Sequence, residues 1–140
     1  MSRADKQTIT SKQPIIYSDF MNDLDLHPLS GDIAKVTNAE SIKQSIRNLI
    51  IIGYGEKLFN PTIGSNVYQS LFEPIDGFTI NDIQDHISDT IGFHEPRVNL
   101  LQVVVSPNPR DENAVTASIV FNIINTGEIA TLNLILTRVR

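Results

Sequence analysis

Residues 92–100 read Gly-Phe-His-Glu-Pro-Arg-Val-Asn-Leu, and they mark the point where a helical pattern of apolar residues changes into a strand pattern. Proline has a φ near about −65° and disfavours helical geometry in the residue before it, so a helix is predicted to end before Pro96. In extended backbone, side chains two residues apart lie on the same side. The sequence therefore predicts that Glu95 and Arg97 lie side by side on a stiff link between a helix and a strand.

The helical pattern before this link comes from isoleucines that recur every three or four residues. It predicts a helix over residues 79–91, which Gly92 closes. The isoleucines that share its inner face are Ile80, Ile83, Ile87 and Ile91. A shorter helix is predicted over residues 65–72. It is predicted to end there because Glu73, the residue before Pro74, disfavours helical backbone.

A second long helix is predicted over residues 37–53. Thr37 and Glu40 have the spacing of a capping box, in which each side chain bonds to a backbone N–H of the first turn. Gly53 is predicted to stop the helix at its C-terminus. Ile51 falls nearly opposite the apolar stripe, so we expect burial on two sides of this helix. A contact between Ile51 and another subunit is the alternative.

The pattern after the link has the period of two that strands require. It predicts strands over residues 97–105, 114–124 and 129–139, with a hairpin turn at residues 125–128. Another short strand is predicted within residues 14–20. Helices followed by a meander predict an α+β fold, in which the helices pack on one face of a small antiparallel sheet that ends in a C-terminal hairpin.

Composition limits the domain organisation and the class of partner. Of the 140 residues, residues 1–13 are polar and predict a flexible N-terminal arm, and residues 14–140 predict one domain in which residues 21–36 form a long loop. The net charge of −5 argues against nucleic-acid binding through basic patches. Without cysteine there are no disulfides and no cysteine zinc sites. The longest apolar run, residues 49–52, is too short to cross a membrane.

No residue pattern predicts catalysis or a bound cofactor. A glycosidase needs two carboxylates, which Glu95 with Asp89 or Glu73 could supply. Arg97 would lower the pKa of Glu95, however, and a general acid needs a raised pKa. The histidines lack metal-ligand spacing; they are His27, His86 and His94. We therefore expect no enzyme activity, no cofactor and no metal site.

Three features could contact a protein partner. The Glu95 and Arg97 side chains could bind a neighbouring chain or only each other. Residues 73–95 hold six acidic residues and no lysine or arginine, which is typical of a solvated helix face or of docking to a basic surface. The last strand could pair with a foreign strand if it lies at a sheet edge, which the sequence leaves open. The candidate partner-binding residues are Glu95, Pro96, Arg97, Ile129, Thr131, Asn133, Ile135, Thr137 and Arg138.

Four short motifs occur in order along the chain. They are Ser41-Ile42-Lys43-Gln44-Ser45-Ile46-Arg47-Asn48-Leu49, then Gly55-Glu56-Lys57-Leu58-Phe59-Asn60-Pro61 followed by Ile63-Gly64-Ser65, then Leu71-Phe72-Glu73-Pro74, and finally Glu95-Pro96-Arg97. Together they resemble the small baseplate wedge protein family of contractile phage tails, over roughly residues 17–140. Relatives of this family also build baseplates in type VI secretion systems, and the family is often labelled lysozyme-like. Lys57 stands where the family usually has arginine.

The resemblance implies a structural protein of the virion rather than an enzyme. It implies a wedge subunit of the tail baseplate that is assembled in the host cytoplasm. The Glu95-Pro96-Arg97 motif would bind the helical core bundle of the wedge proteins. The sheet would pair strands with the tail sheath subunit and so initiate sheath assembly. The tail tube would lie nearby, six copies would stand in a six-fold baseplate, and neither nucleic acid nor membrane would be a partner.

Two alternatives remain at this point. One is a peptidoglycan-cleaving, lysozyme-like enzyme, as the family label says. The other is a free-standing protein-binding module that forms a one-to-one complex with a soluble partner, without any tail particle.

Overall fold

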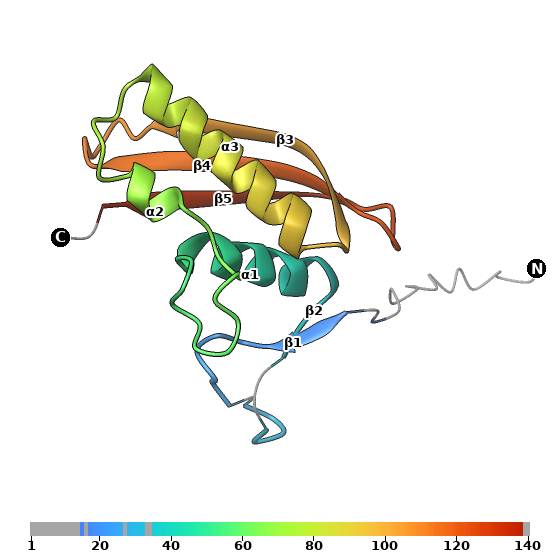
Figure 1. Ribbon diagram of the computed structural model, residues 1–140. Coiled ribbons are helices and arrows are strands. Elements are labelled where there is room, and N and C mark those ends of the chain that lie inside the picture. Colours follow the sequence, from blue (N-terminus) through green and yellow to red (C-terminus); the bar gives the residue numbers. More distant parts are fainter. Residues whose placement is uncertain (1–14, 16, 27, 33–34, 139–140) are drawn as a thin grey trace, which may run out of the picture.

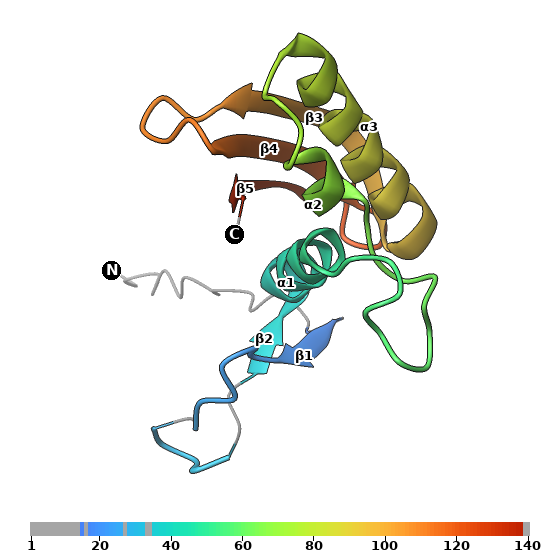
Figure 2. The ribbon, with the colours of Figure 1, turned by 60° about the vertical axis from the view of Figure 1, so that its left-hand side comes forward.

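The computed structural model describes residue 15 and residues 17–26, 28–32 and 35–138 of the chain. Figures 1 and 2 show helices packed on one face of a three-stranded antiparallel sheet, which confirms the predicted α+β fold. The expected flexible arm, residues 1–13, lies outside the described residues. In chain order the elements are β1 (Ser18–Phe20), β2 (Lys35–Thr37), α1 (Asn38–Ile51), α2 (Val67–Ser70), α3 (Gly77–His94), β3 (Val98–Pro107), β4 (Ala114–Ile123) and β5 (Ile129–Thr137).

The core lies between the helices and the central strand of the sheet. The strand order is β3-β4-β5, so β4 has a neighbour on both sides. Its inward side chains are completely buried, as the alternation predicts; they are Val115, Ala117, Ile119, Phe121 and Ile123. They meet the apolar stripes of α1 and α3, whose fully buried isoleucines are Ile42, Ile46, Ile50, Ile83 and Ile87. Each such isoleucine contributes about 1.5–3 kcal/mol relative to an exposed one, so these five side chains hold the two layers together.

The helix α3 is longer at both ends than the isoleucine pattern predicts. It begins after Asp76, whose carboxylate accepts a hydrogen bond from the backbone N–H of Thr79 at 2.9 Å. Gly92 was predicted to close the helix, and this is wrong, because the helix continues through His94. It ends only at Glu95, with φ −122° and ψ 81°, where the following proline excludes helical backbone.

The N-terminus of α1 is held by a different hydrogen bond from the one predicted. The Thr37 side chain makes no capping hydrogen bond, so the predicted capping box is wrong. The backbone N–H of Asn38 instead donates to the carbonyl of Tyr17 at 2.7 Å, and Glu40 forms an ion pair with Lys43 at 2.8 Å. The expected burial of Ile51 is also wrong, since its side chain is 39% exposed.

The shorter predicted elements are present as the predicted helix or strand, but their lengths differ from the prediction. The strand expected within residues 14–20 is β1, and the long loop expected over residues 21–36 ends in β2, which pairs with β1. The short helix expected over residues 65–72 is the four-residue α2. The three C-terminal strands are where the alternation predicts them, and β3 has a bulge between Leu100 and Gln102.

The segment between α1 and α2 is closed by the residues of the second sequence motif. The carboxylate of Glu56 accepts a hydrogen bond from the backbone N–H of Gly53 at 3.1 Å, and the Ser65 hydroxyl donates to the carbonyl of Ile50 at 2.7 Å. Gly53 lies beyond the helix cap at Ile52, as expected for a stop. Gly64 has φ +139°, and a Cβ there would lie 2.6 Å from the carbonyl oxygen of Ile52. Only glycine fits this close backbone approach.

Gly64→Ala should therefore lower the free energy of unfolding by about 2 kcal/mol or more, because it combines an unfavourable φ with a backbone clash. Gly92→Ala is the matched control: it lies in α3, and a Cβ there meets nothing within 4 Å. This control should stabilise the protein by about 0.5–1 kcal/mol. Urea unfolding followed by circular dichroism measures both values. Equal stability of Gly64→Ala and the wild type would contradict the proposed reason for this glycine.

Candidate functional site

The Glu95-Pro96-Arg97 link holds a buried ion pair. The Glu95 side chain is only 2% exposed. The guanidinium of Arg97 donates from Nε to Oε1 at 2.6 Å and from Nη2 to Oε2 at 2.7 Å, which makes a bidentate pair. This confirms the prediction that the two side chains lie side by side. It also shows that the pair forms within the chain.

The same ion pair joins segments that are far apart in the sequence. The Ser45 hydroxyl of α1 donates to Oε2 of Glu95 at 2.7 Å. The guanidinium of Arg97 lies 5.4 Å from the centre of the Tyr17 ring, within the range of a cation–π contact. The Tyr17 hydroxyl in turn accepts a hydrogen bond from the Asn125 amide, in the β4–β5 turn. The link between α3 and β3 is thus tied to α1, to the N-terminal segment and to the hairpin.

The electrostatic balance keeps Glu95 ionised. Burial raises the pKa of Glu95, but the hydrogen bonds from Arg97 and Ser45, together with the positive charge of Arg97, outweigh burial and leave the pKa below its ordinary value. A general acid for glycoside hydrolysis needs the opposite direction. The geometry therefore suits a structural ion pair.

Only part of the link can meet another chain. Glu95 is enclosed by its own chain, whereas Pro96 is exposed and the Arg97 side chain is 32% exposed. Contact with a partner stays a prediction for all three residues. Pro96 and the outer side of Arg97 face solvent, and the bidentate bond from Glu95 holds the arginine in place.

The last strand lies at an edge of the sheet, which the sequence left open. In the described part of the chain, β5 pairs with β4 and with no other strand. The backbone N–H of Ile123 donates to Glu128 at 2.8 Å, and that of Arg138 donates to Asn113 at 3.0 Å. Because antiparallel pairs alternate, the even-numbered residues of β5 bond to β4 and the odd-numbered ones direct their backbone groups outward.

The outward set contains five of the predicted partner-binding residues. They are Ile129, Thr131, Asn133, Ile135 and Thr137. Arg138 differs from them, because its backbone N–H is bonded to Asn113 and its side chain donates to the carbonyl of Phe72 at 3.2 Å. The structure thus brings five candidates together along one edge and turns the sixth toward its own chain.

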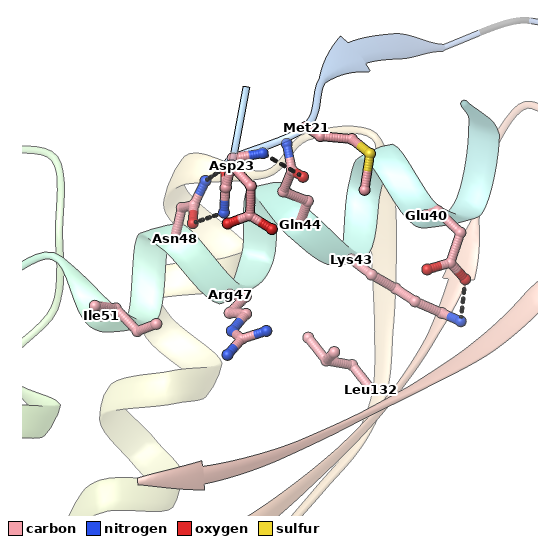
Figure 3. Close-up of a pocket in the computed structure, with 10 residues that line it drawn as sticks. Met21, Asp23, Glu40, Lys43, Gln44, Arg47, Asn48, Ile51 and Leu132 are labelled. Atoms are coloured by element: carbon pink, nitrogen blue, oxygen red, sulfur yellow. Dashed lines mark hydrogen bonds and ion pairs between the residues drawn. The ribbon is translucent and has the colours of Figure 1, made fainter. Parts of the chain in front are cut away.

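A groove that the sequence analysis missed lies along the outer face of α1, bordered by residues 21–23 on one side and by Leu132 of β5 on the other (Figure 3). It has a volume of about 480 Å³, and its walls include Lys43, Arg47, Ile51 and Leu132. A second, smaller hollow of about 280 Å³ continues it along residues 133–136 of β5. The position of Ile51 off the apolar stripe was the signal in the sequence.

The described residues contain neither a metal-binding cluster nor a membrane-spanning helix. Across residues 17–26, 28–32 and 35–138, no group of three or more His, Asp or Glu side chains could hold a metal ion. No helix in the described part of the chain is both long and apolar enough to cross a membrane.

Comparison with known proteins gives consistent matches. The family model described as baseplate wedge protein gp25 matches residues 36–128. Baseplate wedge protein gp25 of Enterobacteria phage T4 is 27% identical over 110 residues, which cover 79% of this chain and 82% of that protein.

Solved structures share the fold. A crystal structure of a candidate tail lysozyme from Geobacter sulfurreducens superposes with a TM-score of 0.68 at 24% identity, covering 75% of this chain and 96% of that one. A chain of the anti-feeding prophage baseplate superposes with a TM-score of 0.61 at 18% identity, covering 89% of this chain and 87% of that one.

The lowered pKa of Glu95 predicts how stability depends on pH. A carboxyl whose pKa is lowered in the folded state adds stability above its ordinary pKa, and this contribution is lost as the pH falls through the lowered value. The free energy of unfolding of the wild type should therefore fall more steeply on acidification than that of Glu95→Gln. Urea unfolding at a series of pH values measures both slopes, with the exposed Glu112→Gln as control. Identical slopes for wild type and Glu95→Gln would contradict the buried ion pair.

Proposed function

This chain belongs to the baseplate wedge protein gp25 family, and from that premise we propose that it anchors to the wedge core of a contractile tail and starts the sheath by strand pairing. Its broader role follows from the family: it is a gp25-like structural component of the baseplate of a contractile tail system. The open edge of β5 is the observation that carries the proposal.

Strand pairing explains why the edge is left bare. Sheet edges in soluble proteins are commonly blunted by lysine, proline or bulges, because unpaired backbone groups recruit other strands. The outward residues of β5 include neither proline nor lysine, and Ile129 and Ile135 are 65% and 67% exposed. A strand of the tail sheath subunit would bond to these backbone groups by β-augmentation.

The anchor to the wedge core would use the outer side of the buried ion pair. Pro96 is exposed, and its ring restricts the backbone at this point. Arg97 is held over Tyr17 by its bond to Glu95. Such a pre-ordered pair of side chains loses little entropy when a helix bundle packs on it. Six copies in a six-fold baseplate, a position near the tail tube and assembly in the host cytoplasm complete the proposal.

A peptidoglycan-cleaving activity would need Glu95 to act as an acid. The lowered pKa of Glu95 and its bidentate bond to Arg97 favour the structural role instead. A cell-wall cleavage assay on purified protein separates the two roles. Activity that disappears on Glu95→Gln would support the enzyme.

Asn133→Pro tests strand pairing. The change removes an N–H that faces the open edge and leaves the β4–β5 hydrogen bonds in place. Baseplates that carry the variant should assemble but lack sheaths in electron micrographs. Asn133→Val keeps the N–H and should give normal sheaths. Circular dichroism establishes that both variants fold. Normal sheaths on folded Asn133→Pro particles would refute pairing at β5.

Arg97→Lys tests the anchor. Lysine keeps a positive charge beside Glu95 but cannot reproduce the planar bidentate group that lies over Tyr17. We expect this variant to fold but to lose binding to the wedge proteins in a pull-down, and so to be missing from assembled baseplates. Ser45→Ala is the matched control, because it removes an inner hydrogen bond to Glu95 without changing the exposed side. Equal incorporation of the two variants would count against the anchor.

A further inference from the structure

The helical layer is wider than the sheet it covers. Two helices side by side, each about 10 Å across, cover about 20 Å, whereas three strands about 4.8 Å apart cover only about 14 Å. Figure 2 shows the consequence: α3 and α2 lie over the sheet, and α1 lies beside β5 at the edge. One more strand next to β5 would give α1 a sheet to cover.

One row of α1 side chains borders the space that this strand would enter. Lys43, Arg47 and Ile51 are spaced four residues apart, next to the buried stripe of α1, and all three line the groove. Leu132 is half-buried on the opposite wall. Ile51 and Leu132 are apolar positions at separate points of the groove, and Arg47 lies between them (Figure 3).

Of the two cationic side chains that line the groove, only Lys43 has an ion-pair partner among the described residues. Lys43 is paired with Glu40 at 2.8 Å. Arg47 makes no hydrogen bond or ion pair with any other described residue, and Figure 3 shows its guanidinium extending toward the β5 side. Asp23, a further carboxylate of the groove, lies with Asn48 and Gln44 across the helix from Leu132. A carboxylate entering beside β5 would therefore find Arg47 available.

The spacing of the two elements also matches. Residues four apart on a helix are about 6 Å apart along its axis, and residues two apart on a strand are about 6.6 Å apart. The groove sets Lys43 and Arg47 beside Leu132, and the second hollow sets Arg47 and Ile51 beside residues 133–136, so α1 runs alongside β5. A strand between them would present alternate side chains to successive residues of the α1 row.

We propose that α1 selects the strand that pairs with β5. Arg47 would lie against an acidic side chain of that strand, and Ile51 and Leu132 would each lie against an apolar side chain two residues to one side of the acidic residue. The partner is thus an extended segment of another chain with alternating apolar and acidic residues on one face. This inference rests on the proposed strand pairing at β5, and it adds a determinant of specificity on a different element.

Two synthetic peptides serve as probes. The first is Lys-Thr-Val-Thr-Glu-Thr-Val-Thr-Lys, which has Val, Glu and Val on one face, and the second has lysine in place of the glutamate. Each is titrated into the full-length 15N-labelled chain, and amide shifts of Thr131, Asn133 and Ile135 report pairing at the edge. The glutamate peptide should bind about twofold to fivefold more tightly than the lysine peptide, the range for an exposed ion pair. Arg47→Glu should reverse this preference.

Arg110→Glu is the matched control, because it makes the same change of charge on an exposed loop outside the groove. It should leave the preference for the glutamate peptide in place. Equal affinities of the wild type for both peptides, or equal effects of the two variants, would overturn selection by α1 while strand pairing stands. Absence of shifts at the β5 edge with either peptide would overturn strand pairing and the inference together.

Discussion

The buried carboxylate of Glu95 is the constraint that organises this molecule. A buried charge needs partners, and it receives three hydrogen bonds, two from Arg97 and one from Ser45. Satisfying these bonds fixes the angle between α3 and β3 and holds α1 against the junction. Because Arg97 also lies over Tyr17, the N-terminal segment is tied to the same point. The ion pair is therefore the joint between the helical layer and the sheet.

The sheet that this joint holds is incomplete as it stands. Its two edge strands are β3 and β5, and the outward backbone groups of β5 meet no strand in the described part of the chain. Beside β5, α1 borders a groove instead of a covered face. An isolated monomer with such an edge risks unwanted pairing. The proposed strand pairing would use this edge, and the family to which the chain belongs supports a structural role in a baseplate.

The sequence motifs of the family have folding roles in this chain before any role in assembly. Glu56, Gly64 and Ser65 close the connection between α1 and α2 through bonds and a close backbone approach. Glu95 likewise bonds to Ser45 and Arg97 of its own chain. The parts of the Glu95-Pro96-Arg97 link that remain exposed are Pro96 and the outer side of Arg97, which the proposed anchor would use.

The sequence by itself determined the features that depend on neighbouring residues. The period of its isoleucines predicted α3, the alternation predicted the faces of β3 to β5, and Pro96 predicted where helix gives way to strand, because each of these is a local steric or packing preference. Tertiary structure decided the rest. Gly92 stays helical since nothing stops the helix before Pro96, and α1 starts through a bond to Tyr17 instead of a capping box. The edge position of β5 and the exposure of Ile51 follow from the number of strands beneath the helices, which no local pattern encodes.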